Sequence, residues 1–270
     1  MVAGTEGDAA IRSPSEGELR EELRGYYDPL LPYWDRTLEH RGDLPFWSEL
    51  AREWAGERVL ELGAGTGRVT RALAAEAGEV VALDLDLEAL RMARDRLADG
   101  SPVRCVLADM RTFRLGKRFP RIAAADDPFS HLRSDADRDR ALERVAEHLA
   151  PDGTFVLDAL WFSEATLAEA TSPEGRSARH VSGGGSGETL VEVRHTWRCD
   201  PDTRLCRAEY EVRAEGRSRS TTFRGRYWTR EEADRRLEAA GLAVREAWGD
   251  YGRAAWTPEA EHLIVVARPL

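Results

Sequence analysis

The sequence predicts an α/β protein, a doubly wound and mainly parallel β-sheet into which an antiparallel β-meander is inserted. Three observations predict this fold. Between residues 58 and 158, short apolar runs alternate with segments of helical periodicity, as in a parallel sheet covered by helices. A glycine-rich turn, GAGTG, follows the first of these runs. After residue 188, three segments alternate apolar and polar residues, as antiparallel strands with one solvated face do.

Composition limits the classes of partner. The chain has 270 residues, 42% hydrophobic and 33% charged, with a formal net charge of −10. This length and hydrophobic content suffice for a substantial core, in one large domain or two small ones. The acidic balance argues against nucleic acid or an anionic membrane as main partner. No apolar run approaches the roughly 18 residues of a membrane helix, and the acidic first residues lack the apolar region of a secretory signal.

The cysteines support a cytoplasmic location. Cys105, Cys199 and Cys206 show no C-x-x-C spacing. We therefore expect neither a disulfide framework nor a structural zinc site. A protein of this kind is compatible with a reducing cytosol.

The N-terminal part is expected to consist of a disordered terminus, residues 1–12, and a helical segment, residues 13–56. Two stretches of that segment have helical periodicity, EGELREELRGYY after Ser15 and PFWSELAREWAG before the first strand. Prolines lie between the two stretches, and Gly56 is a stop signal for the second.

The core, residues 57–160, is expected to contain five short buried strands. They span residues 58–62, 80–84, 103–108, 119–125 and 154–158. Helical periodicity follows the first, second and fourth strands. Ser134 caps the last of these helices, which is expected to run to Ala150, and Pro151-Asp152-Gly153 predicts the turn into the fifth strand.

The rest of the chain divides into an inserted lid, residues 161–228, and a closing part, residues 229–270. The lid is expected to hold a short helix at 163–171, the Gly/Ser-rich stretch SGGGSGE, and three antiparallel strands. Its apolar face can roof a pocket or form a homodimer contact, and most of its aromatic residues can equally be ordinary core. The closing part is expected to add a helix that begins after Thr229 and ends at Gly241, then strands at 242–248 and 262–267.

The glycine-rich turn carries the strongest functional signal. Gly63, Gly65 and Gly67 let the backbone approach a ligand closely, and the next helix presents free N–H groups. The dinucleotide fingerprint G-x-G-x-x-G would require a glycine at position 68, where the chain has Arg68. A nicotinamide-dependent oxidoreductase is therefore disfavoured.

Two carboxylates end the strands that follow. Asp84 ends the second strand, where a carboxylate can accept hydrogen bonds from both ribose hydroxyls. Asp109 ends the third strand, where a carboxylate can accept one from an adenine amine. A turn that merely packs a strand on a helix would not need these two side chains, so a nucleoside-containing cofactor is predicted.

The run Glu61-Leu62-Gly63-Ala64-Gly65-Thr66-Gly67 resembles the first motif of class I S-adenosylmethionine-dependent methyltransferases. The likeness covers Val59 to Asp158 and implies a seven-stranded sheet whose last strand is antiparallel. It also implies S-adenosyl-L-methionine as cofactor and no metal, since the sulfonium makes the methyl group a ready electrophile that needs only an aligned acceptor. The glycines would border its methionine end, Asp84 would hold the ribose, and Asp109 with Met110 would hold the adenine. The candidate cofactor residues are Tyr33, Glu61, Gly63, Ala64, Gly65, Gly67, Arg68, Asp84, Leu85, Asp109, Met110 and Asp126.

Within this family, the chain resembles small-molecule enzymes related to glycine/sarcosine N-methyltransferases and to amino-sugar N-methyltransferases. The shared elements are Tyr27-Asp28, the run Leu115 to Phe119, His131-Leu132, Asp158 and Trp161-Phe162. The likeness implies a small-molecule acceptor, an amine or a hydroxyl, and places His131 near it. An unperturbed histidine can take a proton from an attacking amine, although His131 can also be a residue that only caps a helix.

Tyr27 and Tyr33 can close over the cofactor, or can simply pack as an amphipathic face. Asp126 and Asp127 can anchor an ammonium group, or one of them can be a loop cap.

Two alternatives stay open. The run Asp126-Asp127-Pro128-Phe129 half-matches the [D/N]-P-P-[Y/F] box of enzymes that methylate nucleobase amines, but its first proline is replaced by Asp127. The unusual aspartate pair also leaves room for a non-catalytic module that binds the cofactor without transferring a methyl group. The intact glycine turn, together with Asp84 and Asp109, favours the enzyme.

Overall fold

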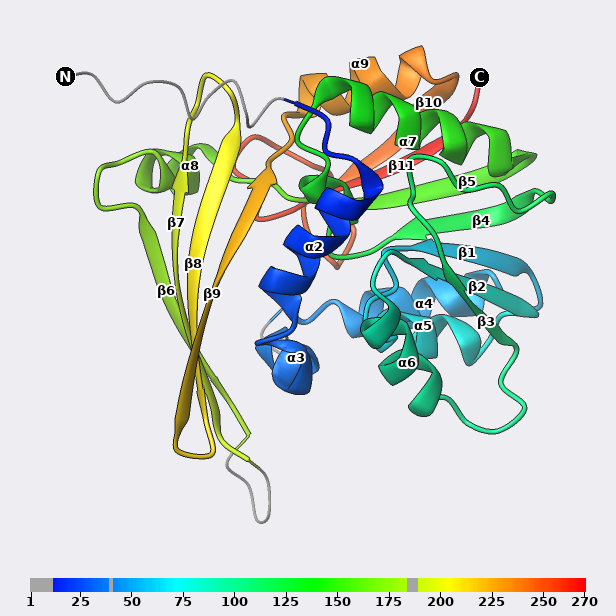
Figure 1. Cartoon of the computed structure of the whole chain (residues 1–270). Coiled ribbons are helices and arrows are strands. Elements are labelled where there is room, and N and C mark those ends of the chain that lie inside the picture. The colour runs from blue at the N-terminus through cyan, green and yellow to red at the C-terminus, as the bar shows by residue number, and fades with distance from the viewer. Residues whose placement is uncertain (1–11, 39–40, 184–188) are drawn as a thin grey trace.

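The computed structural model describes residues 12–38, 41–183 and 189–270, and it contains two β-sheets with an N-terminal helical segment beside them (Figure 1). The disorder predicted for the N-terminus falls on residues 1–11, which lie outside the described part, as do residues 184–188 of the Gly/Ser-rich stretch.

The larger sheet has seven strands in the order β10-β11-β5-β4-β1-β2-β3, which confirms the predicted fold class. The strands from β3 to β5 are parallel, and β11 is antiparallel to both of its neighbours. The chain begins in the middle at β1, builds β2 and β3 on one side and then crosses to β4. Ligands of such sheets bind outside the carboxyl ends of the strands at this reversal. The strands are β1 (Arg58–Leu62), β2 (Glu79–Asp84), β3 (Val103–Leu107), β4 (Phe119–Ala124), β5 (Leu149–Ala159), β10 (Leu242–Trp248) and β11 (Leu263–Pro269).

Helices cover both faces of this sheet. Successive side chains of a strand point to opposite faces, and in the central strands most side chains on both faces are apolar and buried. Val59 packs in a cluster with α4 (Leu44–Glu53) and α5 (Arg68–Ala74) on one face. Its neighbour Leu60 packs on the other face, in a cluster with α7 (Asp135–His148) and α9 (Arg230–Ala239). Helix α6 (Leu87–Asp95) contacts β2 and β3.

Strand β5 begins earlier than predicted. The turn expected at residues 151–153 is wrong, because the chain passes directly from α7 into β5 at Leu149. Leu149 pairs with Phe119 of β4 ahead of a register shift, so backbone pairing extends the strand through these residues.

The smaller sheet, hereafter the lid, is fully antiparallel. It consists of β6 (Arg176–Ser182), β7 (Val191–Cys199), β8 (Leu205–Ala214) and β9 (Arg217–Arg226), in that order. The prediction of three strands is wrong by one, because the edge strand β6 reads RSARHVS and shows little apolar alternation. A short helix, α8 (Glu164–Ala170), precedes the lid.

The N-terminal segment joins the two sheets. Helix α2 (Glu16–Tyr27) starts with a capping box between Ser15 and Glu18, and η1 (Leu31–Tyr33) and α3 (Trp34–Thr37) follow. Leu19 of α2 belongs to the core of the larger sheet, whereas Tyr26 packs with the apolar face of the lid. Figure 1 shows α2 standing between the two sheets.

A buried ionic cluster fastens the end of the lid to the core. Glu232 of α9 is 2% exposed and forms ion pairs with four arginines. Its Oε2 lies 3.2 Å from Arg138 of α7 and 3.1 Å from Arg204 before β8. Its Oε1 lies 3.0 Å from Arg226 at the end of β9 and 2.7 Å from Arg236 of α9. One carboxylate therefore links two core helices with two positions of the lid.

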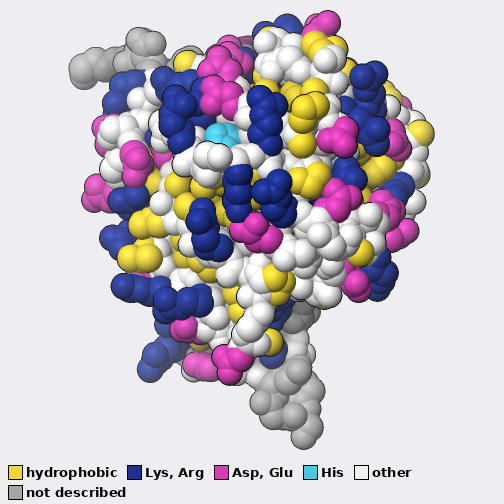
Figure 2. Space-filling model, turned by 90° about the vertical axis from the view of Figure 1, so that its right-hand side faces the viewer, with side chains coloured by type: hydrophobic (Ala, Val, Ile, Leu, Met, Phe, Trp, Pro, Cys, Tyr) yellow, Lys and Arg dark blue, Asp and Glu magenta, His cyan; other side chains and the backbone are white. Residues whose placement is uncertain are grey.

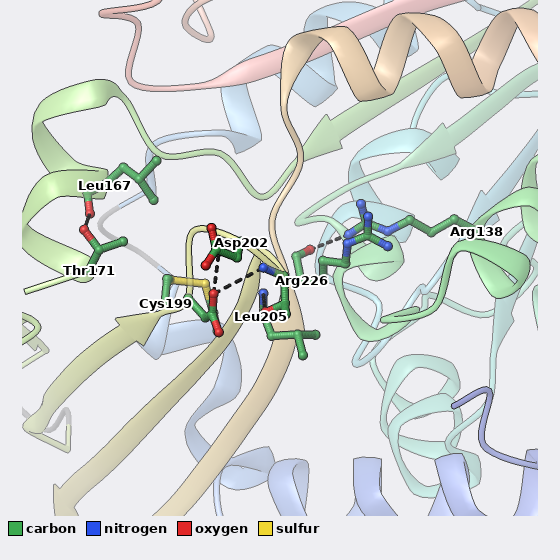
Figure 3. The surroundings of a disulfide bond; sticks show 10 residues. Arg138, Leu167, Thr171, Cys199, Asp202, Leu205 and Arg226 are labelled. Atoms are coloured by element: carbon green, nitrogen blue, oxygen red, sulfur yellow. Dashed lines mark hydrogen bonds between the residues drawn. A yellow bond between two sulfur atoms is a disulfide. The ribbon is translucent and has the colours of Figure 1, made fainter. Parts of the chain in front are cut away.

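A disulfide joins Cys199 and Cys206, contrary to the expectation that the chain has none (Figure 3). The expectation failed because the absence of C-x-x-C spacing says nothing about strand pairing. The hairpin of β7 and β8 sets the two residues directly opposite each other, with 4.1 Å between their Cα atoms. The third cysteine, Cys105, is free.

The surface carries both signs of charge. Figure 2 shows Lys and Arg side chains interspersed with Asp and Glu side chains over the face that lies on the right in Figure 1. None of the helices in the described ranges has both the length and the apolarity that crossing a membrane requires.

We predict that Glu232→Gln lowers the free energy of unfolding by about 3–5 kcal/mol, because it leaves buried guanidinium groups without a counter-charge. Urea unfolding of both proteins measures the difference. Glu231→Gln, at an exposed position one residue earlier in the same helix, is the matched control and should change stability by less than about 0.5 kcal/mol. Equal unfolding midpoints for the two variants would show that the cluster is not stabilising.

The disulfide predicts a simple labelling pattern. In denaturant without reductant, a thiol reagent should modify one cysteine, Cys105, and after reduction it should modify all three. Mass spectrometry counts the labels, and three labels before reduction would contradict the bond. Reduction of so short a loop should cost roughly 2–4 kcal/mol of stability.

Candidate active site

Two adjoining cavities lie at the carboxyl ends of the parallel strands. The loop cavity lies over the glycine-rich turn, and the lid cavity lies between the core and the lid. They share five lining residues, which are Tyr27, Trp34, Leu38, Asp126 and His131. The two spaces therefore meet at the N-terminal segment and the loop after β4.

The glycine-rich turn is shaped by its packing. Gly63 has φ +70°, and a Cβ atom there would lie 2.3 Å from Cβ of Pro128. Gly67 has φ +80°, and a Cβ atom there would lie 2.8 Å from Cβ of Ala93 in α6. Side chains at these positions would push the turn away from its neighbours. Gly63, Ala64 and Gly65 line the loop cavity, whereas Gly67 does not, so Gly67 serves the packing of the turn on α6.

Asp84 faces the loop cavity from the end of β2. The backbone N–H of Gly65 donates to its Oδ2 (2.7 Å), and that of Asp86 donates to its Oδ1 (2.8 Å). Burial raises the pKa of Asp84 to about 6, although these two hydrogen bonds act in the opposite direction. The two bonds fix the carboxylate and leave lone pairs on both oxygens for a pair of hydroxyls.

Asp109 and its neighbours form a further wall of the loop cavity. The backbone N–H and the guanidinium of Arg111 donate to Asp109, which is 3% exposed. Leu85 and Met110 also line the cavity and are apolar. The Asp109 carboxylate, fixed by Arg111, can accept a hydrogen bond from the polar edge of a flat heterocycle, and the apolar side chains beside it can pack on the ring. Together with Asp84 and the close turn, these residues fit an adenosyl group.

Two further predicted residues line the loop cavity but are engaged with protein partners. The Thr70 hydroxyl donates to Glu61 Oε2 (2.5 Å), and burial raises the pKa of Glu61 to about 8. Arg68 makes a two-pronged ion pair with Asp43, at 2.6 and 2.7 Å. Arg68 therefore ties the chain before α4 to the start of α5 rather than presenting an unpaired charge.

Tyr33 does not line either cavity. Its hydroxyl donates to Glu215 of the lid (3.4 Å), and Arg219 lies over its ring, 5.8 Å from the centroid. The next residue, Trp34, lines both cavities instead. The aromatic pair was visible in the sequence, but which of its rings faces the site depends on the short helices η1 and α3.

Tyr27 and His131 meet where the two cavities join. The Tyr27 hydroxyl and Nε2 of His131 are 2.8 Å apart, although their positions lie 104 residues apart in the sequence. Burial lowers the pKa of His131 to about 4, and burial also raises the pKa of Tyr27 well above its usual value. At neutral pH both side chains are uncharged, and we assign His131 the tautomer with its proton on Nδ1, in which the tyrosine donates and Nε2 accepts.

The two aspartates after β4 have different surroundings. Asp127 is 4% exposed; its Oδ2 accepts the N–H of Leu160 (2.7 Å) and its Oδ1 accepts Nε1 of Trp228 (3.4 Å). It thus joins the loop to the residue after β5 and to Trp228, which lies between β9 and α9. Asp126 lines both cavities, and its side chain is 27% exposed.

Arg41 is a site residue that sequence analysis missed. Its guanidinium lies 3.0 Å from Oδ1 of Asp126 and 2.8 Å from Oδ2 of Asp158, and it donates to the hydroxyl of Tyr251 at 2.6 Å. No motif marks an arginine between two N-terminal helices, and only the fold brings it to the ends of β4 and β5.

Aromatic side chains from the lid and from α2 form the far wall of the lid cavity. Tyr26, Trp197, Tyr210 and Phe223 line it, and Phe223 lies 5.4 Å from Tyr26 and 5.1 Å from Trp197 between ring centroids. The apolar face of the lid therefore points toward the site. Homodimer formation stays a prediction.

Comparison with known proteins agrees with this geometry. Residues 59–153 match a family described as "Methyltransferase domain". A dTDP-3-amino-3,6-dideoxy-alpha-D-glucopyranose N,N-dimethyltransferase from Streptomyces fradiae is 34% identical over 210 residues, 74% of this chain and 75% of the relative. A dTDP-3-amino-3,4,6-trideoxy-alpha-D-glucopyranose N,N-dimethyltransferase from Streptomyces venezuelae is 30% identical over 129 residues, 46% of this chain and 53% of that protein.

A solved structure with a similar fold contains bound S-adenosylmethionine. The S-adenosylmethionine-bound amino pentose methyltransferase CalS10 from Micromonospora echinaspora superimposes with a TM-score of 0.68 and 26% identity, over 88% of this chain and 95% of its own. These comparisons confirm the resemblance, the cofactor and the enzyme class inferred from the glycine-rich turn. The chain belongs to the class I S-adenosylmethionine-dependent methyltransferases and resembles their amino-sugar N-methyltransferases.

Proposed function

We propose that this methyltransferase methylates an amine of a small-molecule metabolite, and that the acceptor nitrogen lies where the loop cavity and the lid cavity meet. The observation that carries the proposal is the Tyr27–His131 pair beside Asp126 at that junction. The named activities of the relatives, N,N-dimethylation of amino sugars, support an amine over a hydroxyl. A cytoplasmic location and the absence of a nucleic-acid partner stay predictions.

On this proposal, residues of the loop cavity hold S-adenosyl-L-methionine. Asp84 accepts hydrogen bonds from the ribose hydroxyls, Leu85 and Met110 flank the adenine, and Asp109 lies at its polar edge. Gly63, Ala64 and Gly65 leave room for the methionine part. When bound, the cofactor supplies a methyl group on a positively charged sulfur, which retains the electron pair of the S–C bond when that bond breaks.

The Tyr27–His131 pair orients the acceptor. Only a neutral amine has the lone pair that forms the new N–C bond, so an ammonium ion must first lose its extra proton to solvent water. With its proton directed to Nε2 of His131, the Tyr27 hydroxyl presents its oxygen as an acceptor for a remaining N–H of the amine. His131 is then a positioning residue that holds Tyr27, and alignment of the two reacting atoms supplies most of the rate.

Cofactor binding is the first prediction from this arrangement. Calorimetric titration should show micromolar binding of S-adenosylmethionine and S-adenosylhomocysteine and no binding of NAD. Asp84→Ala should weaken the binding of both by about 10- to 100-fold, because hydrogen bonds to a charged group are lost. Asp95→Ala, on the exposed end of α6, is the matched control. Unchanged affinity in Asp84→Ala would remove this residue from the cofactor site.

The second prediction concerns His131. His131→Ala and Tyr27→Phe should each lower kcat by about 100-fold, the typical loss for a misplaced acceptor, with little change in cofactor affinity. Steady-state kinetics with an accepted amine, together with calorimetry, separate the two effects.

The pH profile distinguishes positioning from proton transfer. Since the pKa of His131 is about 4, His131 stays neutral from about pH 5.5 upward. The kcat profiles of the wild type and of His131→Ala should therefore have the same shape between pH 5.5 and 8. A wild-type inflection near 6.5 that disappears in the variant would show instead that His131 titrates as the base.

A further inference from the structure

The two cavities are strongly acidic in their lining. Asp84, Asp86, Asp109 and Glu61 line the loop cavity, Asp127 and Asp158 line the lid cavity, and Asp126 lines both. Among the described residues, the lysines and arginines that line them are Arg68 in the loop cavity and Arg41 in the lid cavity. Burial raises the pKa of Glu61 to about 8 and that of Asp127 to about 7, so these two are not fully charged at neutral pH. The remaining carboxylates still outnumber the two arginines, so a ligand that enters these spaces meets more negative than positive charge.

Both arginines already have carboxylate partners. Arg68 binds Asp43 through two hydrogen bonds, and Asp43 is 1% exposed. Arg41 binds Asp126 and Asp158, and Asp158 is also 1% exposed. Both terminal nitrogens of each arginine are engaged by these protein partners, and the Nε of Arg41 is left as a single N–H donor without a partner among the described residues. A phosphate group could therefore gain a two-pronged contact only by displacing a buried carboxylate, which is strongly unfavourable.

The rest of the lid cavity suits a cation on an apolar body. Tyr27 and Trp34 line both cavities, as Asp126 does, and their ring centroids lie 4.9 Å apart; the ring of Tyr26 lies 4.6 Å from that of Tyr27. Ring faces attract ammonium groups, and a carboxylate beside them adds a counter-charge. The lid contributes apolar and aromatic residues such as Val193, Trp197 and Phe223 to the wall, together with two histidines, His180 and His195.

We infer that the acceptor is an unphosphorylated amine on an apolar or aromatic body, taken into the lid cavity as an ammonium ion, and not an amine linked to a nucleoside diphosphate. This inference rests on the proposed N-methyltransferase function and narrows its substrate class. It sets the chain apart from relatives whose names specify dTDP-linked amino sugars. A diphosphate bears at least two negative charges and is normally held by arginines or lysines that are free to bind it.

A matched pair of acceptors tests the inference. The same sugar, 3-amino-3,6-dideoxyglucose, is offered to the full-length enzyme as its phenyl glycoside and as its dTDP ester, with phenethylamine as a third acceptor. Release of S-adenosylhomocysteine measures kcat/KM. We expect the phenyl glycoside or phenethylamine to exceed the dTDP ester by at least about 10-fold, as one lost charge interaction would produce.

A binding measurement gives the same answer without turnover. Thymidine 5′-diphosphate is titrated into the protein saturated with S-adenosylhomocysteine. We expect no saturable binding tighter than about 1 mM. Micromolar binding of the diphosphate, or a higher kcat/KM for the dTDP ester, would overturn the inference. It would leave the proposed N-methylation intact, since the enzyme would still be methylating an amine.

The variant Asp126→Asn tests whether the Asp126 carboxylate is responsible for the preference for an amine. The wild type should bind phenethylamine more tightly than phenethyl alcohol, and the variant should lose most of that preference, about 10-fold. Asp152→Asn, at an exposed position, is the control. Equal preference in Asp126→Asn and wild type would contradict the role of Asp126. Failure of all amines as acceptors, with S-adenosylmethionine bound, would instead contradict the proposed function itself.

Discussion

The carboxylate of Glu232 is the interaction on which the position of the lid depends. It lies between α7, α9, the turn before β8 and the end of β9, and each of these elements contributes one arginine to it. An isolated buried carboxylate or guanidinium would be highly unfavourable, so these groups are acceptable only together. The lid cannot shift relative to the core without separating them.

Trp228 connects this ionic cluster to the active site. Arg138 stacks on the ring of Trp228, with its guanidinium carbon 3.9 Å from the centroid, and Trp228 donates to Asp127. Asp127 in turn holds the loop that carries Asp126 and His131. Its positive φ, like that of Asp126, is a conformation that few side chains adopt, and Asp tolerates it better than most. Asp127, which stands where the nucleobase-methylation box has its first proline, thus has a packing role in this loop.

Polar contacts made by α3 and by the residues between α3 and α4 hold the N-terminal segment over the loop cavity. Asp35 of α3 accepts the hydroxyl of Thr66 in the glycine-rich turn (2.6 Å) and pairs with Arg96 after α6 (3.1 Å). Asp43 holds Arg68, and Arg41 holds Asp126 and Asp158. The site is therefore assembled from three distant parts of the chain: the N-terminal segment, the sheet edge and the lid.

The sequence by itself determined the features that depend on neighbouring residues. Periodicity predicted the strands of the larger sheet, and the glycine-rich turn with Asp84 and Asp109 predicted the cofactor, because these residues follow strands whose ends must meet at one edge. Tertiary structure decided what local patterns do not encode. Strand pairing set Cys199 against Cys206 and recruited the charged strand β6. The short helix α3 directs the ring of Trp34, and not that of Tyr33, to the cavities. The close packing of α6 on Gly67 gives that glycine a structural role and no place in the cavity lining. The charge of the lid cavity depends on Arg41, which only a long-range contact places beside Asp126.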